Sequence, residues 1–136
     1  MNKKVILALA LTLGFGLSDM ALACTCAPPP PPAEARDAAD SVFSGRVLSV
    51  TPGKNGLDVE IQVDRSWKQA RCGTVVVQTA SDSAGCGFGF EVGKSYLVYA
   101  DIEKGKLGTS LCSRTRAIED AGEDLAALGE PQQTCG

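Results

Sequence analysis

Apolar and polar residues alternate along the middle of the chain, which predicts a protein built mainly from β-strands. The clearest case is residues 57–67, where Leu57, Val59, Ile61 and Val63 alternate with acidic and amide side chains. A period of two is typical of a strand with one buried face and one polar face. Shorter patterns predict further strands at residues 42–50, 74–79, 94–102 and 106–111.

Turn signals and a change of period complete the predicted order of elements. Asn55-Gly56 lies between the first two strands and is a strong hairpin signal. Residues 33–40 have alanines at helical spacing, and residues 118–128 repeat apolar side chains with a helical period. Thr115 is the expected N-cap of this second helix, and Gly129 is its expected end. Five strands with turns between them predict a small closed barrel or a sandwich.

The first 23 residues have the pattern of a secretory signal peptide. Two lysines precede the uncharged apolar run 5–17, and Ala21-Leu22-Ala23 is a small-x-small cleavage site. The run is shorter than the roughly 20 residues that a membrane-spanning helix needs. We therefore expect a signal peptide of residues 1–23 and a secreted domain of residues 24–136, located in a periplasm or outside the cell, without membrane insertion.

A lipid anchor on Cys24 is the alternative explanation of a cysteine directly after the cleavage site. A lipoprotein signal has leucine three residues before the cysteine and a small residue two before it. Ala21 and Leu22 stand in the opposite order. Lipidation would also leave five of the six cysteines, an odd number, for disulfide bonds. Both observations favour an unmodified Cys24.

Charge and composition exclude several classes of function. The leader carries two lysines and one aspartate, so its removal changes the formal charge from −3 to −4. An acidic chain of this kind argues against nucleic acid or an anionic membrane as a partner. The chain has no histidine, which removes the usual general base and the usual metal ligand. We expect no enzyme activity and no cofactor, and we expect a monomer.

The cysteines predict structural disulfides. An exported chain with six cysteines should be oxidised. Cys24 and Cys26 are separated by one residue, so each should pair with a distant cysteine instead of with the other. The chain has no Cys-x-x-Cys sequence, which argues against a thioredoxin-type redox centre and against a four-thiolate zinc site.

Several segments resemble the tissue inhibitors of metalloproteinases and, more broadly, the netrin-like domain. The mature N-terminus would read Cys-Thr-Cys, followed by the proline run 28–32, a short helix and a strand. Further similar segments are residues 84–88, 93–98 and 107–112. The resemblance covers nearly all of residues 24–135. It implies a mainly β, five-stranded OB-fold-like barrel, with a short N-terminal helix, a C-terminal helix and disulfide bonds between distant segments.

The resemblance also implies a set of bridges. Two of them are Cys24–Cys86 and Cys26–Cys112. The family's third bridge joins the first helix to the tail, but Asp37 stands at the helical position in this chain. We predict Cys72–Cys135 as the third bridge, which departs from the family pattern.

The resemblance implies an inhibitory mechanism. The α-amine and carbonyl oxygen of Cys24 would chelate the catalytic zinc of a target metalloprotease, and Thr25 would point into the pocket beside that zinc. The predicted inhibitory wedge therefore consists of Cys24, Thr25, Cys26, Ser83, Ala84 and Gly85, with Cys24 as the metal ligand.

A second function from another class stays open on the sequence alone. The chain could be a netrin-like protein-interaction module for an envelope or extracellular partner, without protease inhibition. In that case Cys24 is only a structural half-cystine, Thr25 is an exposed linker residue, and residues 83–85 are a turn of small side chains.

Overall fold

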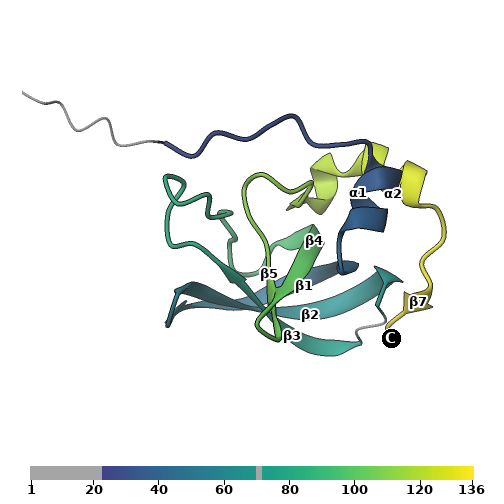
Figure 1. The fold of residues 1–136 in the computed structure, drawn as a ribbon. Coiled ribbons are helices and arrows are strands. Elements are labelled where there is room, and N and C mark those ends of the chain that lie inside the picture. The colour runs from purple at the N-terminus through teal and green to yellow at the C-terminus, as the bar shows by residue number, and fades with distance from the viewer. Residues whose placement is uncertain (1–22, 70–71) are drawn as a thin grey trace, which may run out of the picture.

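A computed structural model describes residues 23–69 and 72–136 of the chain. The predicted signal peptide, apart from Ala23, therefore lies outside the described residues. Two short helices and seven strands appear in the described part (Figure 1). In chain order they are α1 (Pro32–Ala38), β1 (Ser41–Gly53), β2 (Gly56–Lys68), β3 (Gly73–Thr79), β4 (Ser95–Glu103), β5 (Lys106–Gly108), β6 (Arg116–Ala117), a 3₁₀ turn (Ile118–Asp120), α2 (Gly122–Leu128) and β7 (Gln133–Thr134).

Five of the strands form a closed ring. Strands β1, β2, β3, β5 and β4 pair in that order, and β4 pairs back with β1. All of these pairings are antiparallel except β3 with β5. β1 is long and has irregular register against β2, and such bulges bend a strand. Its first half pairs with both β2 and β4, which closes the ring. The prediction of a mainly β chain is confirmed.

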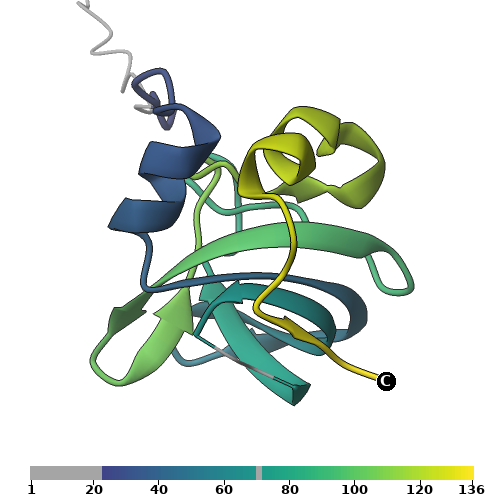
Figure 2. The same ribbon diagram turned by 90° about the vertical axis from the view of Figure 1, so that its right-hand side faces the viewer.

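The apolar residues divide into two clusters because β4 is buried on both faces. Val98 and Ala100 belong to the cluster inside the ring, whereas Leu97 and Tyr99 belong to a second cluster beneath the helices. Figure 2 shows α1 and α2 side by side above the ring. The first cluster comprises Phe43, Val47, Val59, Ile61, Val63, Val77, Phe90, Tyr96, Val98, Ala100 and Leu107.

The C-terminal helix is shorter than predicted, and its expected N-cap is wrong. Residues 116–117 pair with β4 as β6, and α2 begins only at Gly122. The Thr115 hydroxyl is buried and accepts the backbone N–H of Tyr99 at 3.0 Å, so it caps no helix. The expected end of the helix is confirmed, because Gly129 has φ 66°, a conformation that favours glycine.

The strand predicted at residues 106–111 is also shorter, ending at Gly108. Beyond the end of the strand, the Thr109 hydroxyl donates to the carbonyl oxygen of Tyr99 in β4 at 2.8 Å. Among the residues that the structure describes, no helix is long and apolar enough to cross a membrane.

Candidate functional site

Two disulfide bonds fix the segment Cys24-Thr25-Cys26 to two distant loops. Cys24 is bonded to Cys86, and Cys26 is bonded to Cys112, with a Cα–Cα distance of 5.1 Å in each bridge. These are the pairs that the family resemblance implies. Thr25 lies between the two anchored cysteines and is exposed. The segment is therefore restrained at both ends while its central side chain faces solvent.

The loop that carries Cys86 is a compact turn. The Asp82 carboxylate accepts the N–H of Gly85 at 2.8 Å, and the Asp82 carbonyl oxygen accepts the N–H of Gly87 at 2.8 Å. A Cβ at Gly87 would lie 2.1 Å from the carbonyl oxygen of Ala80, so only glycine fits there. The turn exposes three small residues next to the bridge, Ser83, Ala84 and Gly85.

A second loop, residues 109–115, carries Cys112, the disulfide partner of Cys26. Its backbone is joined directly to the first loop, because the Leu111 N–H donates to the carbonyl oxygen of Cys86 at 2.8 Å. The Ser110 hydroxyl accepts the N–H of Cys112 at 3.2 Å. The structure thus brings the predicted wedge residues Cys24, Thr25 and Cys26 to the loop that carries the other three.

The third bridge, Cys72–Cys135, is separate from this site. It joins the residue before β3 to the tail after β7, with a Cα–Cα distance of 5.5 Å. The Cys135 N–H also donates to the carbonyl oxygen of Asp64 at 2.8 Å. In Figure 1 the C-terminal end lies at the right, whereas the loop between β3 and β4 extends to the left. This bridge therefore stabilises the ring and not the N-terminal segment.

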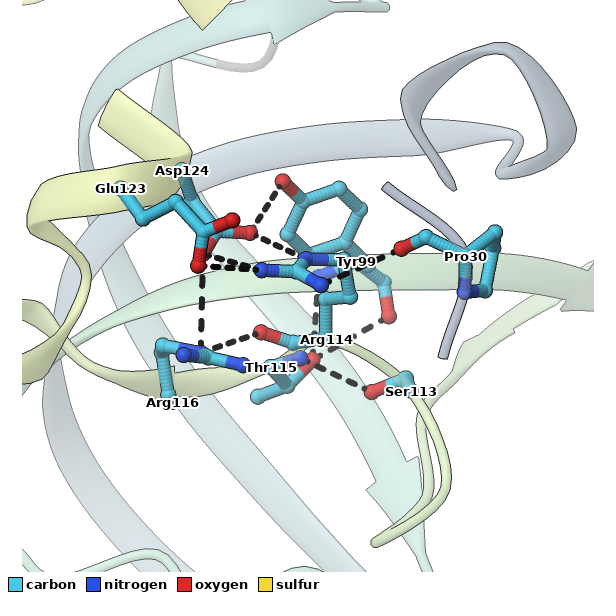
Figure 3. A network of polar contacts seen from close by, with 8 residues as sticks. All are labelled: Pro30, Tyr99, Ser113, Arg114, Thr115, Arg116, Glu123 and Asp124. Atoms are coloured by element: carbon cyan, nitrogen blue, oxygen red, sulfur yellow. Dashed lines mark hydrogen bonds and ion pairs between the residues drawn. The ribbon is translucent and has the colours of Figure 1, made fainter. Parts of the chain in front are cut away.

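A buried ion pair between Arg114 and Asp124 holds the chain that follows Cys26 (Figure 3). Arg114 donates two hydrogen bonds to the Asp124 carboxylate, at 2.7 and 2.9 Å. The side chain of Asp124 is 0% exposed and that of Arg114 is 7% exposed. A third hydrogen bond runs from Arg114 to the carbonyl oxygen of Pro30, at 3.1 Å. The proline run that follows Cys26 is thereby tied to the core.

The surroundings of this pair favour its charged form. Burial opposes ionisation of the Asp124 carboxyl, but hydrogen bonds from Arg114 and Tyr99 outweigh burial and hold its pKa below the ordinary value. The hydrogen bond to Asp124 raises the pKa of Arg114. Burial, together with the 2.8 Å hydrogen bond from its hydroxyl to Asp124, raises the pKa of Tyr99. Arg114 therefore remains a cation and Asp124 an anion over the ordinary pH range.

Sequence reasoning missed Arg114 and Asp124, although the sequence contains a signal for them. Asp124 lies three residues after Ala121 and four before Leu128, on the apolar stripe of the helical pattern. An acidic residue on a buried stripe requires a cationic partner, because an unpaired buried charge is costly. Nothing in the local pattern identifies Arg114 as that partner, since the contact depends on how the ring closes.

Comparison with known proteins does not identify a family. No protein-family model matches the chain, and no curated protein matches it.

Proposed function

We propose that the chain is a secreted metalloprotease inhibitor of the netrin-like type, located in a periplasm or outside the cell. The observation that carries the proposal is the double anchoring of Cys24-Thr25-Cys26 beside the exposed residues 83–85. Residues 24–26 and 83–85 form this exposed edge, because the first segment is bonded to the loop that carries the second and to the loop 109–115. In this proposal the edge enters the active-site cleft of the partner protease.

The chemistry of the edge depends on Cys24. Cleavage after Ala23 creates an α-amine on this residue, next to its own carbonyl oxygen. An α-amine has a pKa of about 7.7–8.0, so its neutral, metal-binding form is accessible near neutral pH. A catalytic zinc has three protein ligands and one open position that holds water. The amine and the carbonyl oxygen of Cys24 displace that water and leave the protease without its nucleophile.

Restraint of the edge contributes to affinity. Binding a flexible segment costs free energy, because the segment must be ordered in the complex. Here the bridges at Cys24 and Cys26 hold one part of the segment, and the hydrogen bond from Arg114 to Pro30 holds the part that follows. The segment therefore meets its partner with its conformation already restricted.

The closed ring is, in this proposal, the scaffold for the edge. We assign it to the OB-fold-like barrels, because five strands close through a β1–β4 pairing and the helices lie together against the outer face of β4. The loops between β3 and β4 and after β5 both leave one end of this scaffold, and both carry a half-cystine of the edge.

The test compares three oxidised proteins against a panel of secreted zinc proteases. The first begins at Cys24, the second has one alanine added before Cys24, and the third has one alanine added after Gly136. We expect the first and third to inhibit at least one protease with equal potency, and the second to lose inhibition at least a hundredfold. Intact mass must show a free amine on Cys24 in the first and third.

Two outcomes would contradict the proposal. Full potency with the added N-terminal alanine would mean that the amine does not bind zinc. Lack of inhibition across the panel by the protein with a free Cys24 amine would favour a netrin-like interaction module instead.

A further inference from the structure

The two N-terminal bridges lie against each other at Cys112. The Sγ atom of Cys112 lies 3.6 Å from that of Cys24 and 4.0 Å from that of Cys86, the two bonded sulfurs of the neighbouring bridge. Cys112 itself is bonded to Cys26. Disulfides exchange when a thiolate attacks a disulfide sulfur, so Cys112 becomes a nucleophile beside the neighbouring bridge once its own bond opens.

The Cys26–Cys112 bridge is the one that a small thiol reaches first. Cys26 is exposed, whereas Cys24, Cys86 and Cys112 are partly buried. Access to the attacked sulfur is one of the factors that set the rate of exchange. A small thiolate therefore attacks the Sγ atom of Cys26, forms a mixed disulfide with it and releases Cys112 as a thiolate.

Contacts that do not depend on the opened bridge keep Cys112 beside its neighbour. The Leu111 N–H donates to the carbonyl oxygen of Cys86 at 2.8 Å, and the Ser110 hydroxyl accepts the N–H of Cys112 at 3.2 Å. Cys24 is still bonded to Cys86, so the intact bridge holds both of the sulfurs that the thiolate contacts. The Cys112 thiolate therefore stays within reach of that bridge.

We propose that the two N-terminal bridges form a thiol-sensitive switch, in which Cys112 changes its partner from Cys26 to Cys24. The Cys112 thiolate attacks the Sγ atom of Cys24, which is the nearer sulfur. The Cys24–Cys112 bond forms, the Cys24–Cys86 bond breaks, and its electron pair leaves on Cys86, which takes a proton from water. The number of disulfide bonds is conserved, because the bond lost within the chain becomes the mixed disulfide between Cys26 and the small thiol.

The exchange divides the proposed inhibitory edge. Before it, the Cys24–Cys86 bridge joins residues 24–26 to the loop that carries residues 83–85. After it, Cys24 is bonded to the loop 109–115, and the loop with residues 83–85 carries a free thiol. The loss of inhibition that follows rests on the proposed function, whereas the exchange itself does not and is measured without a protease.

The first experiment locates the free thiol after brief treatment of the folded, oxidised mature chain with glutathione. It is run at about pH 8, where a thiol is partly ionised, and is stopped with N-ethylmaleimide before digestion and mass spectrometry. In chains with glutathione on Cys26, we expect at least as much maleimide on Cys86 as on Cys112, and a Cys24–Cys112 linked peptide. Absence of glutathione on Cys26, or maleimide confined to Cys112 in those chains, would overturn the proposal.

A second measurement uses the oxidised variant Cys26→Ser, in which Cys112 lacks its partner from the start. We expect maleimide on both Cys112 and Cys86, because the exchange runs in both directions. The matched control Cys135→Ser leaves Cys72 without its partner instead, and the maleimide should stay on Cys72. Label on Cys112 alone in the first variant, or label spread over several cysteines in the control, would contradict an exchange specific to the two N-terminal bridges.

Discussion

The N-terminal segment is held at two places by different forces. At Cys24 and Cys26 the restraint is covalent and lies at the surface. At Pro30 the restraint is a hydrogen bond from Arg114, whose charge is balanced by Asp124 in the interior. The first restraint yields to a reductant, and the second yields to acid or to loss of one charge. The same segment can therefore be released from either end by a different treatment.

The largest effect is expected from removing the interior charge of Asp124. The variant Asp124→Ala leaves the Arg114 cation buried without its partner, which typically costs about 3–5 kcal/mol of unfolding free energy. Urea denaturation measures this loss as a lower midpoint with an unchanged slope. The matched control is Glu123→Ala, because Glu123 is the exposed neighbour and lies 3.5 Å from Arg114. This control should stay within about 0.5 kcal/mol of the parent protein. Equal losses in the two variants would refute the assigned role of Asp124.

The next largest effect is expected from breaking the covalent restraint. The variant Cys26→Ser/Cys112→Ser removes one bridge and should lower the unfolding free energy by about 2–4 kcal/mol. The remaining Cys24–Cys86 bridge still limits the unfolded chain, so the loss stays below that expected for a single isolated bridge. Urea denaturation under oxidising conditions measures it. Stability equal to that of the parent protein would show that this bridge adds no restraint beyond that of its neighbour.

The two restraints also differ in how far the sequence predicts them. The leader and the count of six cysteines predict disulfide bonds, because an oxidised chain must pair its thiols. The alternation over residues 57–67 predicts β2. In the structure the apolar members of this pattern, Val59, Ile61 and Val63, face the inside of the ring. Such features depend on local patterns that the sequence displays directly.

The buried pair depends on long-range geometry. Arg114 precedes β6, Asp124 lies in α2, and Tyr99 lies in β4, so their contact exists only after these elements pack. The same holds for Thr115, whose sequence context resembles an N-cap. Its hydroxyl instead accepts a hydrogen bond from β4, since β6 lies beside that strand. A local pattern shows that a polar residue needs a partner but not which partner the fold supplies.

Acid should weaken the restraint at Pro30, which depends on the Arg114–Asp124 ion pair, and not the disulfide restraint at Cys24 and Cys26. The pKa of Asp124 is lowered in the folded chain, so its contribution to stability is complete above the ordinary aspartate pKa of about 3.9. That contribution is lost as the pH falls through the lower, folded-state pKa. The effect is smaller than that of Asp124→Ala, because a protonated carboxyl keeps its shape and still forms hydrogen bonds.

Urea denaturation at a series of pH values from 7 to about 2 tests whether the stability that Asp124 contributes is lost as the pH falls. The control is Asp124→Asn, which has the shape of the protonated acid and no titration at this position. The difference in stability between the parent protein and this variant should shrink as the pH falls. A constant difference would mean that ionisation of Asp124 does not stabilise the fold.

The smallest effect is expected from removing the hydrogen bond that the Tyr99 hydroxyl donates to the Asp124 carboxylate. The Tyr99 hydroxyl donates to Asp124 at 2.8 Å, and Tyr99→Phe removes this donor without changing the packing of the ring. A hydrogen bond to a charged group contributes about 1.5–3 kcal/mol to the free energy of unfolding. We expect a loss at the lower end of this range, because Arg114 still donates hydrogen bonds to the carboxylate. The matched control is Tyr96→Phe, since the Tyr96 hydroxyl accepts the backbone N–H of Glu91, away from the ion pair. In Tyr99→Phe the pKa of Asp124 should rise because one stabilising hydrogen bond is gone, so acid unfolding should begin at a higher pH. An unchanged onset would show that the two neighbouring arginines, Arg114 and Arg116, set the ionisation of Asp124 without Tyr99, and that Tyr99 contributes to packing and not to the charge of the pair.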